Sequence, residues 1–245
     1  FPQFVRTAVR VLPTTWAMLG LKALRRRIVS IKSTQQITRA MKMVAAARLR
    51  RAQERIIEAR PYADKMREVL QSLSLRTEPK AHPLLVRREM KRVELLLITT
   101  DRGLCGGFNQ NIFRRVERFR RENQSVYPEI SLTIVGRKGG DYFRRRQVPI
   151  TRDYGDRFRD MDYQAAATIG TDLVGDYTGE VVDGVFLVYN EFRSPLVQQV
   201  VIKDLLPIEP LEVEPDYYPV EYIYEPSAEA ILSELLPRYV EVQIY

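Results

Sequence analysis

The sequence predicts an α/β protein with a long N-terminal helix of the coiled-coil type, a three-layer α/β body built on a mostly parallel sheet, and a short C-terminal helix. No glycine or proline lies between Gly20 and Pro61, so a single helix can extend through that stretch because these residues are the strongest helix breakers. From residue 93 onward, apolar β-branched runs alternate with helical spacings, which is typical of parallel strands joined by helices.

The predicted long helix carries an apolar seam whose residues recur mostly every three or four positions. Its members are Leu21, Leu24, Ile28, Ile31, Met41, Ala45, Leu49, Ala52 and Ile56, with Thr34 and Thr38 between the two halves. Over residues 21–60 the helix would be roughly 60 Å long at 1.5 Å per residue. One interpretation is a solvated surface helix with one buried stripe. The other is a shaft whose seam packs on a second long helix and whose basic face contacts another protein.

The charge of the chain is distributed unevenly. Residues 1–53 contain twelve Lys or Arg and no Asp or Glu, whereas the rest of the chain carries 27 basic and 31 acidic residues. Such a basic arm attracts an acidic partner, which could be nucleic acid, anionic lipid or an acidic protein loop. Residues 1–17 precede Met18, which looks like a natural start, and we expect them to be a disordered extension or a fragment edge, with a targeting segment as the alternative.

The body is predicted to contain three buried strands, a hairpin partner and three helices in alternation. A glycine-rich loop, DRGLCGGFNQN, separates the first strand from the first helix of the body. The elements are a strand at Val93–Thr100, a helix at Ile112–Glu122, a strand at Ile130–Val135, a short helix within GRKGGDYFRRR, a helix at Tyr163–Tyr177, a strand at Val182–Tyr189 and its hairpin partner at Val197–Ile202.

After the body, the chain is rich in proline and acid before it becomes helical again. Ser227 is a helix-cap candidate, and Leu232, Leu235 and Leu236 form the apolar face of the helix that follows. The expected regions are 18–60 as the basic shaft helix, 61–92 as a linker and helix, 93–206 as the α/β body, 207–226 as the proline- and acid-rich segment, and 227–245 as the start of a C-terminal helix.

Composition and motifs exclude several classes of chemistry. The chain is too apolar to be disordered, and it has no run of about 18 apolar residues that would cross a membrane. Its one cysteine, Cys105, and its one histidine, His82, argue against an internal disulfide, a histidine-rich metal site and thiol catalysis. The Gly103–Gly107 loop lacks the lysine and hydroxyl of a phosphate loop, so its glycines are read as a tight turn and Cys105 as a small buried residue. We therefore predict no catalytic residue, no cofactor and no metal site.

Four segments in order resemble the gamma subunit of F-type rotary ATP synthases. They are RRRIVSIKSTQQITRAMKMVAAARLRRAQ, ITTDRGLCGGFNQN, VGRKGGDYFRRR and EPSAEAILSELLPRYVEVQIY, and the resemblance runs from about Met18 to Tyr245. It implies a non-catalytic central stalk, turned by a membrane ring of c subunits, that drives the catalytic beta subunits through conformations that make ATP. It also implies alpha, beta, epsilon and c subunits as partners, without nucleic acid or direct nucleotide binding, and a peripheral location on the cytoplasmic face of a bacterial plasma membrane.

The resemblance also implies contact residues. Met41 matches the family methionine that faces acidic loops of the beta subunits, and the basic residues around it are expected to meet the same loops. These basic residues are Arg39, Lys42, Arg48, Arg50 and Arg51. Tyr222, Tyr224 and Glu225 match the foot that meets the c ring and epsilon, whereas the glycine loop is assigned no contact.

Two departures from the family accompany the resemblance. The family continues after QIY with a second long helix, so we expect this chain to be a fragment of a longer one. Because the chain has a single cysteine, we predict that it has no redox switch based on an internal disulfide. Two other hypotheses stay open, namely a nucleic-acid binder that uses the basic arm and an α/β enzyme that uses the Gly103–Gly107 loop.

Overall fold

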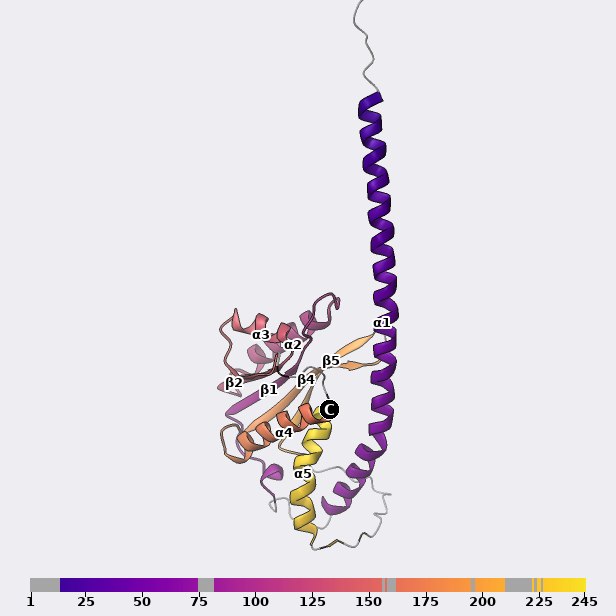
Figure 1. Cartoon of the computed structure of the whole chain (residues 1–245). Coiled ribbons are helices and arrows are strands. Elements are labelled where there is room, and N and C mark those ends of the chain that lie inside the picture. Colours follow the sequence, from indigo (N-terminus) through magenta and orange to yellow (C-terminus); the bar gives the residue numbers. More distant parts are fainter. Residues whose placement is uncertain are drawn as a thin grey trace, which may run out of the picture. The chain divides into compact units, whose positions relative to one another are not determined.

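The computed structural model describes residues 14–74, 82–155, 157, 162–194, 197–209, 222, 224, 225 and 227–245. The expectations for residues 1–13 and for most of the proline- and acid-rich segment lie outside these residues. The chain divides into two compact units, Phe1–Pro61 and Tyr62–Tyr245. The predicted fold class is confirmed, with a long N-terminal helix, a mostly parallel five-stranded sheet and a short C-terminal helix (Figure 1).

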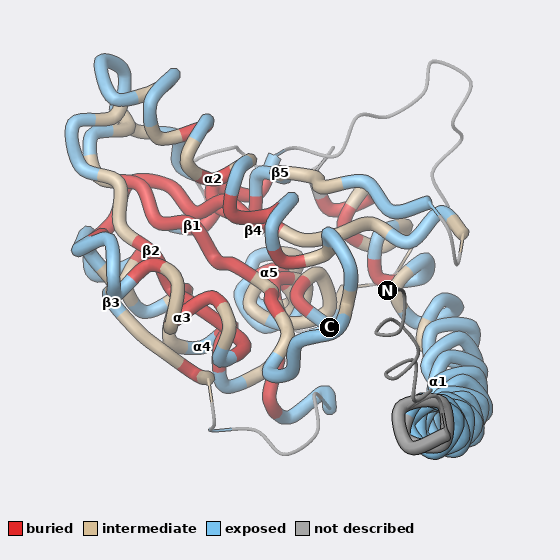
Figure 2. The backbone as a smooth tube through the Cα atoms, turned by 90° about the horizontal axis from the view of Figure 1, so that it is seen from above, coloured by how far each residue is buried: buried red, intermediate tan, exposed pale blue. Residues whose placement is uncertain are grey.

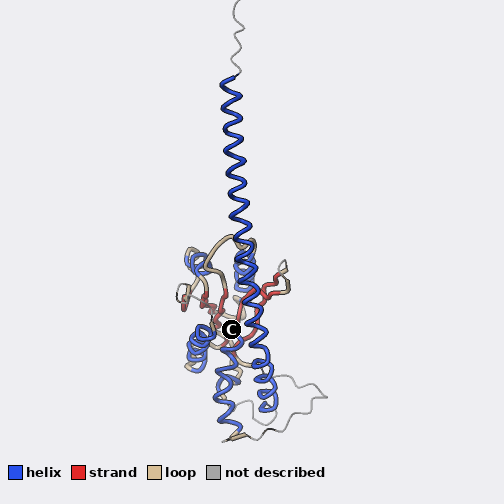
Figure 3. The backbone as a smooth tube through the Cα atoms, turned by 45° about the vertical axis from the view of Figure 1, so that its right-hand side comes forward, coloured by secondary structure: helices blue, strands red, loops and turns tan. Residues whose placement is uncertain are grey.

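The first helix, α1 (Thr14–Ser74), is 61 residues long and contains no strand or loop along its described length (Figure 3). Every residue from Gly20 to Glu58 is exposed within the chain. The two threonines that interrupt the apolar seam satisfy their hydroxyls on the helix itself, because Thr34 donates to the carbonyl of Ser30 at 3.0 Å and Thr38 to that of Thr34 at 2.8 Å. The helix therefore continues unbroken through the two threonines that interrupt the apolar seam.

The helix does not end before the proline at position 61, as the sequence predicts, but continues to Ser74. An interior proline removes one helical hydrogen bond and costs about 3 kcal/mol. The turns after it bury Met66, Leu70 and Leu73 in the body, where they are 5%, 3% and 0% exposed. Burial of each of these side chains contributes about 1.5–3 kcal/mol, which outweighs the cost of the proline. This gain from tertiary packing explains why the shaft helix, expected to end at residue 60, continues into the region 61–92 that was expected to be a linker and helix.

The body contains one five-stranded sheet with the strand order β3-β2-β1-β4-β5. Only the pair β4–β5 is antiparallel; the others are parallel. The strands are β1 (Arg92–Ile98), β2 (Glu129–Val135), β3 (Ile150–Asp153), β4 (Gly184–Phe192) and β5 (Gln198–Leu206). β3 was not predicted, because it is only four residues long, has a single apolar residue and pairs on one side alone.

Helices cover both faces of the sheet, which gives the three predicted layers. On β1, Leu95 and Leu97 face one apolar cluster with α2 and α3, whereas Leu96 faces the other cluster with α4 and α5. The helices are α2 (Phe108–Asn123), α3 (Arg137–Arg144), α4 (Tyr163–Thr178) and α5 (Ala228–Ile244), and a short 3-10 helix, η1 (Pro83–Leu85), precedes the sheet. Buried residues concentrate in the strands and on the helix faces beside them, while the described residues of α1 from Gly20 to Glu58 are exposed (Figure 2).

The C-terminal helix begins where the sequence predicts. The side chain of Ser227 accepts a hydrogen bond from the backbone N–H of Ala230 at 3.2 Å, which caps the first turn of α5. Leu232 and Leu236 are buried and Leu235 is half-buried, so the predicted apolar face packs on the body as expected.

Candidate partner-contact surfaces

All six sequence-predicted contact residues of the long helix are exposed. Met41 is 53% exposed, which is far from the near-complete burial usual for a core methionine. Arg50 pairs with Glu54 at 2.9 Å, but both side chains are more than half exposed, so this pair contributes only about 0.3–0.5 kcal/mol. Arg39 and Lys42 have no acidic residue within four positions, so their charges have no local helix partner.

The helix distributes these six residues around its axis rather than on one face. At about 100° per residue, Arg39 and Arg50 lie opposite Met41. Lys42 and Arg51 lie on the two flanks of the seam, and Arg48 lies beside Met41. The structure therefore surrounds the apolar seam with cations in several directions, and one flat partner surface cannot contact all six.

The apolar seam itself is uncovered within the described part of the chain. Its large members are more than half exposed, except for one that is exposed at 36%. They are Leu21 57%, Leu24 57%, Ile28 52%, Ile31 59%, Met41 53%, Leu49 36% and Ile56 54%. A long stripe of exposed apolar side chains at helical spacing is typical of an interaction surface. Apolar residues that are scattered singly over a protein surface do not show such a spacing.

Two of the three predicted foot residues have hydrogen-bond partners within the body. The Tyr222 hydroxyl donates to Oε1 of Glu68 at 2.6 Å, and the Tyr224 hydroxyl donates to Oγ of Ser72 at 2.9 Å. Both tyrosines are half-buried, whereas Glu225 is exposed. The hydrogen bond from Tyr222 lowers the pKa of Glu68, and the ammonium of Lys65 lowers it further. Tyr222 and Tyr224 are therefore fastened to the end of α1, and Glu225 is the accessible one of the three foot residues.

The loop after β1 is held by a residue that the sequence analysis did not single out. Asn109, at the start of α2, accepts from the backbone N–H of Thr100 at 3.1 Å and donates to its hydroxyl at 2.7 Å. It also donates to the sulfur of Cys105 at 3.3 Å. Cys105 is half-buried rather than buried as predicted, because the loop curves outward and Leu104 at its tip is 98% exposed. The repeated glycines around it were a signal for the turn, but nothing marked Asn109.

Two other titratable side chains have structural roles as helix caps. Nδ1 of His82 accepts from the backbone N–H of Leu84 at 3.2 Å and caps η1, and burial lowers its pKa. Asp162 caps α4 by accepting from the backbone N–H of Ala165 at 2.9 Å. In the part of the chain that the structure describes, no group of three His, Cys, Asp or Glu side chains could hold a metal ion. No helix within those residues is both long and apolar enough to cross a bilayer.

The fold and these surfaces define a class of protein that combines a long, exposed, apolar and basic helix with an α/β body. The sequence model of the ATP synthase family matches residues 20–245. The chain is 46% identical over 228 residues to the ATP synthase gamma chain of Geobacter sp. (strain M21) and 48% identical over 228 residues to that of Pelotomaculum thermopropionicum. Each match covers 93% of this chain and 79% of the relative.

Solved structures of ATP synthase assemblies contain chains with a similar fold. The central stalk and c-ring structure of the mitochondrial ATP synthase of Tetrahymena thermophila contains a chain that matches with a TM-score of 0.62 and 25% identity, over 85% of this chain and 89% of that one. The rotor of the Euglena gracilis mitochondrial enzyme shares the fold, with a TM-score of 0.58 at 20% identity over 91% of this chain and 82% of that one. The chain belongs to the ATP synthase gamma-chain family.

Proposed function

We propose that this chain couples rotation of a membrane c ring to conformational change in catalytic beta subunits, and so to ATP synthesis, without binding substrate itself. The observation that carries the proposal is the exposed seam of α1 with basic residues on several sides of it. A shaft inside a ring of subunits meets protein in every direction, and the distribution of Arg39, Lys42, Arg48, Arg50 and Arg51 around the axis suits that environment.

The partners in this proposal follow from the charge and the exposure of each surface. The basic residues of α1 would meet acidic loops of beta subunits, within a head of alpha and beta subunits. The exposed Glu225, together with Tyr222 and Tyr224, would meet epsilon and the c ring. The chain would then lie peripherally on the cytoplasmic face of a bacterial plasma membrane, where its partners hold it.

The experiment uses the full chain assembled with its alpha, beta, epsilon and c partners in membrane vesicles. Charge reversal at Arg39 and Lys42 together (Arg39→Glu, Lys42→Glu) should weaken the coupling of ATP hydrolysis to proton pumping while assembly persists, because each exposed contact is individually weak. The matched control is Arg118→Glu, which reverses the charge of an exposed arginine on α2 in the body. Unchanged coupling in the double variant, or an equal loss in the control, would refute the proposed contact.

The foot has a separate test in the same assembly. Glu225→Lys reverses the exposed charge and should lower the amount of epsilon and c ring that co-purifies with the chain. Glu122→Lys reverses the charge of an exposed carboxylate on α2, outside the proposed foot, and serves as the matched control. If both variants retain epsilon and the c ring equally, the exposed carboxylate of Glu225 is not a contact.

A further inference from the structure

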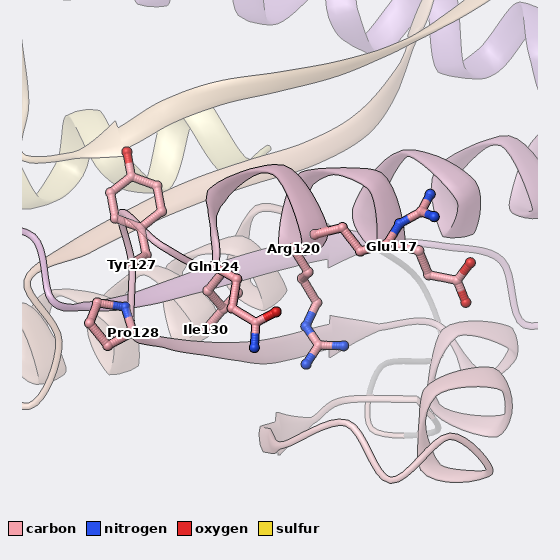
Figure 4. A pocket seen from close by; sticks show the side chains of 7 residues that line it. Glu117, Arg120, Gln124, Tyr127, Pro128 and Ile130 are labelled. Atoms are coloured by element: carbon pink, nitrogen blue, oxygen red, sulfur yellow. The ribbon is translucent and has the colours of Figure 1, made fainter.

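A pocket in the body lies between the last turns of α2 and the start of β2, and neither proposed contact surface includes it. Its volume is about 370 Å³. The lining consists of Glu117, Arg120, Arg121, Gln124, Tyr127, Pro128 and Ile130 (Figure 4). α2 contributes the polar wall and the segment that leads into β2 contributes the apolar one, so charged and apolar groups face the same space.

The two arginines of the pocket have unused hydrogen-bonding capacity. The Nε of Arg120 is buried and has no hydrogen-bond partner in the described part of the chain. Neither Arg120 nor Arg121 forms an ion pair with a residue that the structure describes. A buried donor without a partner is unfavourable, so an acceptor that entered the pocket and reached this guanidinium would relieve the cost.

The acidic residue of the lining does not neutralise these arginines. Oε1 of Glu117 accepts from the hydroxyl of Tyr142 at 2.8 Å and forms an ion pair with the Nε of Arg146 at 3.2 Å, and both partners lie on the α3 side. In Figure 4 the guanidinium of Arg120, the amide of Gln124 and the carboxylate of Glu117 all extend to the same side of α2, with the carboxylate farther along the helix. The pocket therefore offers cationic and amide donors whose local counter-charge is already bound elsewhere.

We propose that this pocket binds a small phosphate-class anion, with the Arg120 guanidinium and the Gln124 amide as donors and Arg121 as a second cation. Guanidinium groups are planar, permanently charged and suited to two-point contact with phosphate oxygens. A volume of 370 Å³ is at the small end of ligand pockets and accommodates a phosphate or pyrophosphate with some water.

The position of the pocket sets the strength of this binding. Arg120 and Arg121 lie in the last turn of α2, where the helix carries a partial negative charge of about half a unit. This charge repels an anion and offsets part of the attraction of the two arginines. We therefore expect dissociation constants in the millimolar range, with pyrophosphate bound more tightly than phosphate because it carries more charge.

The test is isothermal titration calorimetry of the full chain with inorganic phosphate and with pyrophosphate at constant ionic strength. Saturable binding that Arg120→Gln weakens by about tenfold or more is the expected result, since the charged two-point contact is lost. Arg118→Gln on the exposed side of α2 is the matched control and should change the affinity by less than about twofold. Melting temperatures of the unliganded variants show whether each remains folded, and Arg121→Gln gives a second, weaker reduction if Arg120→Gln does not fold.

Three outcomes would overturn the proposal. One is the absence of saturable binding of either anion, and another is equal weakening in the Arg118→Gln control. The third is equally tight binding of acetate and glutamate, which would make the pocket a general carboxylate site rather than a phosphate site. The titration needs none of the other subunits, so its failure would leave the coupling experiment on α1 unaffected.

Discussion

Replacement of Gly136 by alanine should severely destabilise the body. Gly136 lies between β2 and α3 with a φ of 96°, a conformation that L-residues rarely adopt. A Cβ at this position would lie 2.2 Å from the carbonyl oxygen of Thr99 and 2.7 Å from its Oγ1, and both distances are far below a normal contact. The strained φ alone costs about 1–3 kcal/mol.

Thr99 cannot move aside without losing its own hydrogen bonds. Its backbone N–H donates to the carbonyl of Val135 at 2.8 Å, and its hydroxyl lies 2.9 Å from the same carbonyl and accepts from the N–H of Gly139 at 3.1 Å. Loss of two such bonds adds about 2 kcal/mol to the strain. We therefore expect Gly136→Ala to lower the free energy of unfolding by about 3–5 kcal/mol, a large fraction of the stability of an ordinary domain.

The matched control is Gly175→Ala within α4. No atom lies within 4 Å of a Cβ at Gly175, so this alanine should raise stability by about 0.5–1 kcal/mol through helix propensity. The assay is urea unfolding of the full chain followed by near-ultraviolet circular dichroism of the tyrosines, because α1 dominates the far-ultraviolet signal. A Gly136→Ala variant within about 1 kcal/mol of the parent would show that neither the φ nor the approach to Thr99 constrains this turn.

Two further substitutions test the pH dependence of stability, measured as melting temperature against pH. Burial raises the pKa of Glu94 in spite of its hydrogen bond from Thr133. The carboxyl group therefore stays protonated to a higher pH in the folded state than in the unfolded state. Stability should fall as pH rises from about 4.3 through the raised pKa of Glu94. The variant Glu94→Gln should abolish this decline. A decline that persists in the variant would show that Glu94 is not its cause. Burial alone would raise the pKa of Asp183, but hydrogen bonds from the side chain of Arg92 and from the backbone N–H groups of Arg92 and Lys91 outweigh it and lower the pKa. Its stabilisation should therefore be lost as pH falls through the lowered pKa, and Asp183→Asn should cost about 2 kcal/mol at neutral pH with little further loss in acid.

Buried strands were the most predictable part of the fold. The runs that became β1, β2 and β4 are continuous and apolar because parallel strands are covered on both faces, so their composition alone marks them. The edge strand β3 has no such run. It pairs with one neighbouring strand only, and a single apolar residue is enough to hold it at the edge of the sheet. The continuation of α1 past Pro61 was also unpredictable, because it depends on burial of side chains against elements that are distant in sequence.

The site residues that the sequence missed are polar groups whose partners are set by tertiary structure. Asn109 fixes the loop through Thr100 and Cys105, yet its sequence neighbours carry no pattern that distinguishes it from a solvated asparagine. Glu94 lies within an apolar run and its charge is visible there, but only the structure shows that one of its oxygens is buried and unpartnered. The spacing of apolar residues in the sequence indicates which face of an element is buried. It cannot indicate which polar atom on that face has a hydrogen-bond partner.

The uneven distribution of charge connects the sequence to the proposed coupling. In the body, basic residues find acidic partners across elements, as Arg152 does with Asp176 and Arg92 with Asp183. The long helix cannot do the same for the cations before Arg50, because its first acidic residue is Glu54 and a helix brings together only residues three or four positions apart. These exposed cations on several sides of the seam therefore remain available to acidic groups on other molecules, as the proposed coupling requires.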